Sequence, residues 1–253
     1  MKRLVLSICL AAMVSGVMAD TKYRDFTSAE GKTIRGCIQA YDARTKTVTI
    51  ERDNRRISKV QITVFSEADQ AYILEWDSAK GFLSDRLLKI TTDKKRMNQR
   101  KEKEWGTVRY EGGGSEKELM KETSFESYVY NITLQNMNDS ELDNLRMEYR
   151  VYYEQSKESW EKPVLEQKIF KAEISIPKIE SRKKIMKSTK PVEVYHDNIA
   201  QKNWVSGRIR TGGEGEVHGL RARIYMKMPS GKEVMREVTY PQKLSEKKFP
   251  WKE

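Results

Sequence analysis

The side chains that most often carry out catalysis are few in this chain, and their spacing matches none of the common catalytic motifs. His196 and His218 are the only histidines, and neither has a partner at a metal-ligand spacing. No Gly-x-Ser-x-Gly nucleophile elbow occurs, and the glycines at 112–114 lack the Gly-Lys-Ser/Thr ending of a phosphate loop. Acidic residues are scattered among lysines, whereas a glycosidase needs two opposed carboxylates in a cleft. We therefore expect no enzymatic activity, no metal and no cofactor, and an unrecognised hydrolase is the alternative.

Binding to an anionic polymer is the chemistry that the charged residues favour. The formal net charge is +11, and a basic protein attracts anionic glycans and lipid headgroups. Residues 220–228 alternate between apolar and polar, which predicts a strand with one basic face. The candidate polyanion-binding residues are Arg221, Arg223, Tyr225 and Lys227 on that strand, and Lys94, Lys95 and Arg96 in a run interpreted as a helical turn or a loop. The alternative is an ordinary solvent face, which is often lysine-rich on an edge strand.

Aromatic side chains suggest a second kind of binding. Tyr41, Tyr72 and Trp76 are candidates for a peptide groove, because aromatic residues hold extended ligands in SH3-type grooves. Tyr72 and Trp76 are four residues apart on one helix face, so packing against the neighbouring strands is the alternative. Trp105, Trp160 and Trp204 could form a platform for sugar stacking, and the alternative for them is a core or loop-anchoring role.

The segment that must position the candidate peptide groove has a clear local pattern. Residues 47–51 and 59–63 alternate between apolar and polar, as half-buried strands do. Asp53 and Asn54 between them suit a tight hairpin, since both tolerate positive φ. Ser66 offers an N-cap oxygen with Asp69 three residues later, which predicts the start of a helix.

This ordered set of strands, turn and helix start resembles the Sla homology domain-1 family, a small SH3-like module of endocytic adaptors. The residues that carry the resemblance are Arg24, Phe26 and Thr27, then 31–34, 48–50, 53–55 and 65–70. The resemblance covers residues 23–76, about one fifth of the chain, and the rest is unrecognised. It implies a compact β module that recognises short peptides, and no individual binding residue is carried over from the family.

The remaining residues predict a short linker followed by a larger β domain. We place the linker at 77–85 and the second domain at 86–253, after a module at 22–76. Alternating runs near 87–92, 128–134, 149–153, 164–176, 191–195, 220–228 and 234–239 predict about seven strands, the fourth ended by Pro177. That number favours an antiparallel, immunoglobulin-like β-sandwich. The glycine-rich stretch around His218 is interpreted as a hairpin connection, with an active loop as the alternative.

The first 19 residues have the composition of a signal peptide. Lys2 and Arg3 precede an apolar stretch at 4–17, and Ala19 supplies the small residue that cleavage requires. A transmembrane anchor is the alternative, but the stretch is shorter than the roughly 20 residues that span a bilayer. Cleavage after Ala19 leaves Cys37 as the only cysteine, so no intramolecular disulfide can form. We expect Cys37 to be a half-buried strand residue, and a reactive thiol or intermolecular link is the alternative.

These features together predict an exported, two-domain, mainly β protein of the bacterial cell envelope, either periplasmic or extracellular. The leading hypothesis is a non-catalytic adaptor that binds a protein or peptide partner through its SH3-like module. The alternative is a carbohydrate- or polyanion-binding sandwich at the cell surface, in contact with an anionic glycan or a membrane surface. Nucleic acid is an unlikely partner, since export removes the usual targets and no nucleic-acid motif occurs.

Overall fold

The computed structural model describes residues 23–110, 112–160, 163–199 and 211–251. That part of the chain is mainly β, and it forms three antiparallel sheets, none of them closed into a barrel, with one α-helix. The chain divides into two compact units, Met1–Trp76 and Asp77–Glu253. The predicted signal peptide, its cut after Ala19, and Trp204 lie outside the described residues. No helix in the described ranges is long and apolar enough to cross a membrane.

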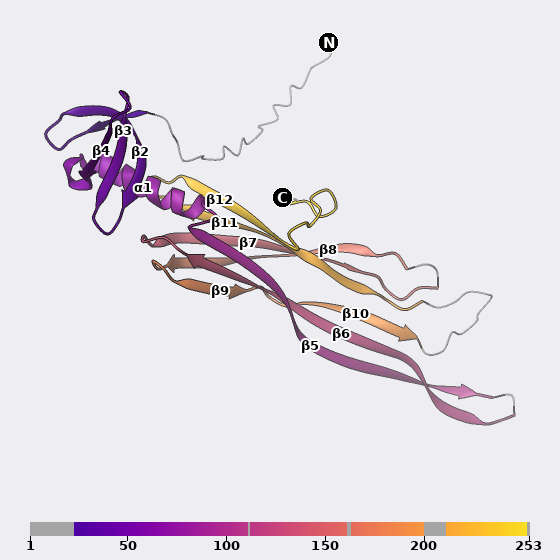
Figure 1. Cartoon of the computed structure of the whole chain (residues 1–253). Helices are drawn as coiled ribbons and strands as arrows, with labels where there is room; N and C mark the ends of the chain where they lie inside the picture. Colours follow the sequence, from indigo (N-terminus) through magenta and orange to yellow (C-terminus); the bar gives the residue numbers. More distant parts are fainter. Residues whose placement is uncertain (1–22, 111, 161–162, 200–210, 252–253) are drawn as a thin grey trace, which may run out of the picture. The chain divides into compact units, whose positions relative to one another are not determined.

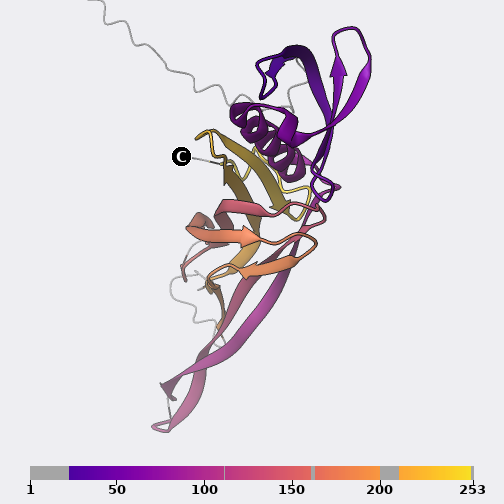
Figure 2. The same cartoon turned by 90° about the vertical axis from the view of Figure 1, so that its left-hand side faces the viewer.

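The first unit contains one four-stranded sheet whose strands follow chain order, drawn in indigo in Figure 2. Its strands are β1 (Arg24–Thr27), β2 (Thr33–Asp42), β3 (Thr47–Arg52) and β4 (Ile57–Gln61). A 3-10 turn, η1 (Ile62–Val64), follows β4. An isolated bridge then joins Phe65 back to Ser28. The buried core of the unit lies on one face of this sheet and includes Phe26, Ile38, Val48, Ile50, Ile62, Phe65, Ile73 and Trp76.

The predicted hairpin at Asp53 and Asn54 is present between β3 and β4, but a different residue takes the left-handed conformation. Arg55 has φ of 63°, whereas neither predicted residue has a positive φ. The Asn54 side-chain oxygen accepts the N–H of Arg56 at 3.1 Å. Asparagine therefore makes this turn through its side chain, which folds back on the backbone two residues ahead.

The helix α1 (Glu67–Leu83) begins where the sequence predicts and ends later. The Asp69 N–H donates to Ser66 Oγ at 3.3 Å, which confirms Ser66 as the N-cap. Residues 77–83, predicted to be linker, are instead helical. They stay helical because Ala79 and Phe82 are buried in the core of the second unit, so packing stabilises the last turns.

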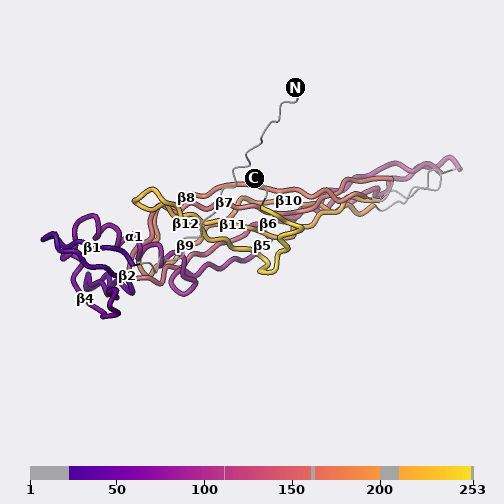
Figure 3. Tube along the Cα trace, turned by 90° about the horizontal axis from the view of Figure 1, so that it is seen from above, coloured from indigo at the N-terminus to yellow at the C-terminus, as the bar shows by residue number. Residues whose placement is uncertain are grey.

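The second unit consists of two antiparallel sheets in a sandwich-like layout (Figure 1). One sheet contains β5 (Leu88–Arg109), β6 (Ser115–Asn136), β9 (Lys184–Ser188) and β10 (Val192–Ile199). The other has the order β12 (Glu233–Tyr240), β11 (Gly215–Lys227), β7 (Leu142–Gln155) and β8 (Glu166–Ile179). Within this unit the strands of both sheets run along a common direction (Figure 3), as in aligned sheet packing.

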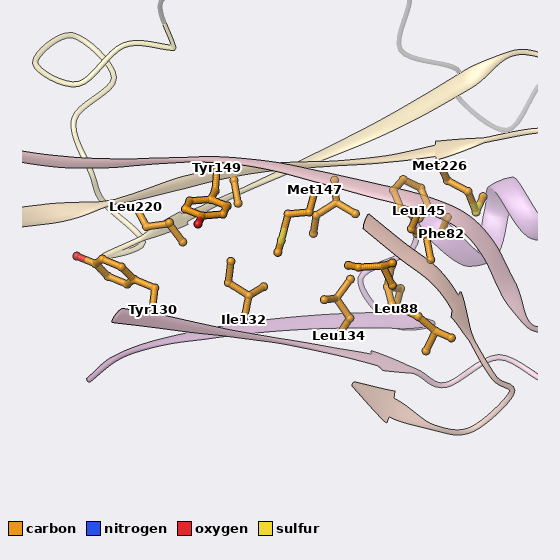
Figure 4. Packing of buried hydrophobic residues seen from close by; sticks show 14 of the residues in the cluster. Phe82, Leu88, Tyr130, Ile132, Leu134, Leu145, Met147, Tyr149, Leu220 and Met226 are labelled. Atoms are coloured by element: carbon orange, nitrogen blue, oxygen red, sulfur yellow. The ribbon is translucent and has the colours of Figure 1, made fainter. Parts of the chain in front are cut away.

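The core of the second unit fills the space between its two sheets. Figure 4 shows Tyr130, Ile132 and Leu134 of β6 pointing toward Tyr149 and Met147 of the opposite sheet. Each of these side chains is almost completely excluded from solvent. The alternation of apolar residues along β6, β7 and β11 arises from this packing, since every second side chain of a strand faces the same side.

The basic run around residues 94–101 is a strand, not the helical turn or loop that was predicted. It belongs to β5, a strand of 22 residues that pairs with β6 from Leu88 to Arg109 with two register shifts. Among the described residues, strand β10 pairs with β6 as far as Ile199 opposite Lys121, and β5 and β6 continue from there as a two-stranded ribbon. The outer half of β5 faces no core among the described residues, so its sequence lacks the apolar alternation of a half-buried strand.

Strand β8 passes through Pro177, which was predicted to end it, and continues to Ile179. A proline lacks the N–H of a sheet ladder but is tolerated on an edge strand. Strand β8 is at the edge of its sheet, and the register with β7 is unshifted on both sides of Pro177. The residue of β7 that faces Pro177 is Asn144, which has φ of 55° and forms no ladder pair with it. The irregularity in β7 and the free edge together accommodate the proline.

Candidate functional site

The first unit contains a cavity of about 420 Å³. Strands β1–β4, turn η1 and the adjoining turns supply its lining, and helix α1 contributes no residue. Its apolar walls come from Phe26, Ile34, Ile50, Val60, Val64 and Phe65. We call this cavity the β-groove. Its floor is part of the core, because Phe26 and Ile50 are fully buried, whereas Val64 at its edge is 48% exposed.

A glycine allows the strands beneath the β-groove to approach each other closely. Gly36 of β2 lies against β3, where a Cβ atom would be 2.5 Å from Ile50 Cγ2 and 2.8 Å from the carbonyl oxygen of Glu51. Any side chain at this position would push Ile50 out of the floor. The local sequence Arg-Gly-Cys in β2 is therefore part of what shapes the β-groove.

The rim of the β-groove carries polar and charged groups. Lys32 and Glu30 form an exposed ion pair at 3.0 Å, which contributes little stability by itself. Arg52 also lines the cavity, and its Nε is buried with no hydrogen-bond partner among the described residues. An unsatisfied buried donor is costly. A ligand that places a carbonyl or carboxylate oxygen beside Arg52 would remove this cost.

The three aromatic residues predicted to form a peptide groove do not line the β-groove. Trp76 is buried in the core of the first unit, and Tyr41 and Tyr72 pack against that core. The ring centroids of Tyr72 and Phe26 are 6.2 Å apart, and the guanidinium carbon of Arg24 lies 3.8 Å from the centroid of the Tyr72 ring. For Tyr72 and Trp76 this packing is the alternative that was considered from the sequence, and Tyr41 packs in the same way.

An ion pair that the sequence did not suggest joins the partly exposed Arg24 of β1 to a buried carboxylate at the start of α1. The Asp69 carboxylate accepts hydrogen bonds from Arg24 Nη2 at 2.8 Å and from the Thr27 N–H at 2.7 Å. The Ser66 hydroxyl donates to the same carboxylate at 3.1 Å. The capping pattern reveals Asp69 as a helix-start residue, but no local signal indicates a partner 45 residues away.

The basic face predicted on β11 is largely neutralised by its neighbours. Arg221 and Arg223 each lie 2.8 Å from one carboxylate, that of Glu237 on β12. The guanidinium of Arg146 covers the ring of Tyr225 at 4.3 Å, and Lys227 at the strand end is opposite Glu233. Strand β11 is interior to its sheet and is not an edge. The sequence alone could not show which acidic residues the adjacent strands would place here.

The basic cluster at Lys94, Lys95 and Arg96 is also divided. Lys94 is partly buried, its Nζ donates to the Val217 carbonyl at 2.9 Å, and burial lowers the pKa of its ammonium group. Arg96 pairs with Glu126 at 3.1 Å. Lys95 is exposed and extends from the opposite face of the strand, since successive side chains alternate. The three cations therefore do not form one anion-binding surface.

The other residues considered from the sequence are spread over the molecule. Trp105 on β5 and Trp160 are both exposed, and Cys37 is buried on β2. His196 lies on β10, and His218 lies inside β11 at a β-bulge, not in a hairpin connection. The Nε2 atom of His218 is 2.9 Å from a carboxylate oxygen of Glu154. Among the described residues no group of three potential ligands could hold a metal ion.

No family model matches the chain, and no curated protein matches it. The resemblance of residues 23–76 to the Sla homology domain-1 family is therefore still a prediction from the sequence.

Proposed function

We propose that this protein is a non-catalytic interaction or adaptor protein of the cell envelope that binds a peptide or protein partner through the β-groove of its first unit. The observation that carries the proposal is the β-groove itself. Its apolar walls suit one or two side chains of an extended ligand, and the unsatisfied Arg52 Nε suits a backbone or side-chain oxygen. Such a mixture of apolar lining and few convergent polar groups is typical of binding sites.

The arrangement of the first unit supports an SH3-like interpretation. Four antiparallel strands are followed by a 3-10 turn, and the chain then returns to the first strand at Ser28 and Phe65. The Ala29 N–H donates to the Val64 carbonyl at 2.9 Å, and the Ser66 N–H donates to the Thr27 carbonyl at 2.8 Å. In this proposal the immunoglobulin-like sandwich of the second unit is a scaffold. The predicted signal peptide would deliver the protein to the periplasm or the exterior.

The alternative of polyanion binding is less well supported than peptide binding. Glu237 and Glu126 neutralise the arginines that were its main candidates, and Lys94 is engaged by a backbone carbonyl. An anionic chain would have to compete with these partners at each cation. Long-range attraction by the net positive charge is still available, but salt weakens it.

A pull-down from envelope extract with matched variants tests the proposal. Val64→Glu places a charge in the β-groove at an exposed position, so we expect the fold to persist and partner capture to fall at least about tenfold. Ile57→Glu is the control, since Ile57 is 69% exposed on β4 and does not line the β-groove. Arg52→Gln should also weaken capture.

Two outcomes would overturn this reading. Equal capture by the wild type and the Val64→Glu variant would place the partner elsewhere on the molecule. Retention only on anionic polymer, lost with added salt and equal in all variants, would favour the polyanion alternative. Export is tested separately by the mass of the mature protein, which should begin at Asp20.

A further inference from the structure

The segment after β12 lies against the outer face of β7 and β11 in the second unit. The ring of Phe249 is 5% exposed and contacts the rings of Tyr152 at 5.5 Å and His218 at 5.0 Å. The ring of Trp251 lies 4.1 Å from the guanidinium carbon of Arg150 and 4.4 Å from that of Arg223. We call residues 248–251 the C-terminal segment and the surface that they cover the arginine face.

The C-terminal segment is held as an extended peptide ligand would be. The Tyr152 hydroxyl donates to the Pro250 carbonyl at 2.8 Å, and Gln167 Nε2 donates to the Lys248 carbonyl at 3.0 Å. Lys248 also pairs with Glu154 at 3.3 Å. Residues 248–251 belong to no strand of a sheet. Side chains of β7 and β8 therefore bind alternate backbone carbonyls while aromatic side chains fill adjacent positions, as in recognition of short peptides.

Two arginines beneath the C-terminal segment are incompletely satisfied. Arg150 and Arg221 are directly opposite each other on β7 and β11, and they are only 7% and 3% exposed. Arg150 Nη1 and Arg221 Nε are buried and have no hydrogen-bond partner within the described ranges. Glu237 is shared between Arg221 and Arg223, and the exposed Glu246 lies 3.9 Å from Arg221, so the three arginines of the cluster face two carboxylates. Burying unpaired charged donors is unfavourable.

We propose that the arginine face is a peptide-binding site for an extended segment that combines an aromatic–proline–aromatic core with a carboxylate. The chain's own C-terminal segment occupies the site in cis and is an incomplete ligand. Its rings and carbonyls fill the apolar and hydrogen-bonding positions, but residues 248–251 supply no anion. Glu246, just before the segment, comes only within 3.9 Å of Arg221 Nη1, and no described carboxylate pairs with Arg150. A competing peptide that supplies a carboxylate would accept charge-assisted hydrogen bonds from these guanidinium groups and would displace the C-terminal segment.

Binding of a short peptide in trans tests the proposal on the full chain. The protein carries Phe249→Ala and Trp251→Ala to weaken the competing segment. The probes are fluorescein-labelled Lys-Phe-Pro-Trp with a free carboxylate and the same peptide as a carboxamide, followed by fluorescence anisotropy. We expect both to bind, the free acid at least about tenfold more tightly. Adding Arg150→Gln should reduce the affinity for the acid to that for the amide.

Specific outcomes would overturn the proposal. Absence of binding by both probes would mean that the segment is ordinary packing, and equal affinity for acid and amide would remove the role of the arginines. If the variants fail to fold, the unmodified chain is titrated with the acid peptide while the indole N–H signal of Trp251 is followed by NMR. Displacement should shift this signal, and an unchanged signal at millimolar peptide would refute the proposal. Val64→Glu in the β-groove should leave every result unchanged.

Discussion

Replacement of Asp69 by alanine tests the reasoning about the buried carboxylate of the first unit. The substitution removes the acceptor of the Thr27 N–H at 2.7 Å, the partner of Arg24 at 2.8 Å and the acceptor of the Ser66 hydroxyl. A hydrogen bond to a charged group contributes about 1.5–3 kcal/mol. The Arg24 side chain is 37% exposed, so water partly replaces its lost partner and its share is small. We expect a loss of about 3 kcal/mol in stability of the first unit.

Hydrogen exchange measured by mass spectrometry is the suitable assay, because it reports on β1 separately from the second unit. A loss of about 3 kcal/mol corresponds to exchange of the β1 amides roughly 100-fold faster, where exchange follows local opening. Glu67→Ala is the matched control, since Glu67 is an exposed residue of the same helix turn and should change stability by less than about 0.5 kcal/mol. Similar exchange in both variants would show that the Asp69 contacts do not stabilise the unit.

Two further predictions concern the second unit. Gly213→Ala would place a Cβ atom 2.7 Å from Tyr195 Cε2 and 2.9 Å from the Ser156 carbonyl oxygen, so thermal unfolding should show a loss of about 1–3 kcal/mol, and an unchanged melting temperature would contradict the close approach. Asp77 accepts the Ser140 hydroxyl at 2.6 Å, and burial raises the pKa of its carboxyl. A raised folded-state pKa means that the stability from this group is complete below its unfolded pKa and is lost as pH rises through the folded pKa. Asp77→Asn should therefore be more stable than wild type at pH 7 but not at pH 3, as urea unfolding would show; equal differences at both pH values would contradict this.

The strands and the helix start of the first unit were predictable because their signals are local. Val48 and Ile50 alternate with polar neighbours, and Ser66 caps the helix through an atom three residues from its target. The end of α1 was not predictable in this way. Residues 77–83 stay helical because Phe82 enters a core formed by strands far along the chain. The sequence near residue 82 does not indicate that contact.

The outer part of β5 was predicted as a helical turn or loop because it lies away from the core of the second unit. The periodic signal of a strand comes from one buried face, and the outer part of β5 has none among the described residues, so its alternating charges resembled a loop. The basic residues of β11 illustrate a related limit. Their spacing predicts a common face, but whether that face is free depends on Glu237 of the neighbouring strand and on Trp251 of the C-terminal segment. The β-groove likewise depends on which apolar residues the fold leaves uncovered.

The ribbon formed by the ends of β5 and β6 has a consequence for how this protein can vary. Past the last described pair of β10 with β6, Ile199 opposite Lys121, the described residues of β5 and β6 pair only with each other. This two-stranded part ends at Arg109 opposite Ser115. Changes in its length therefore need not disturb the packed sheets. Because strand side chains alternate, insertions of an even number of residues in each strand would preserve which side each residue occupies. We expect related chains to differ here in steps of two residues per strand, while the paired lengths of β7 and β11 stay constant.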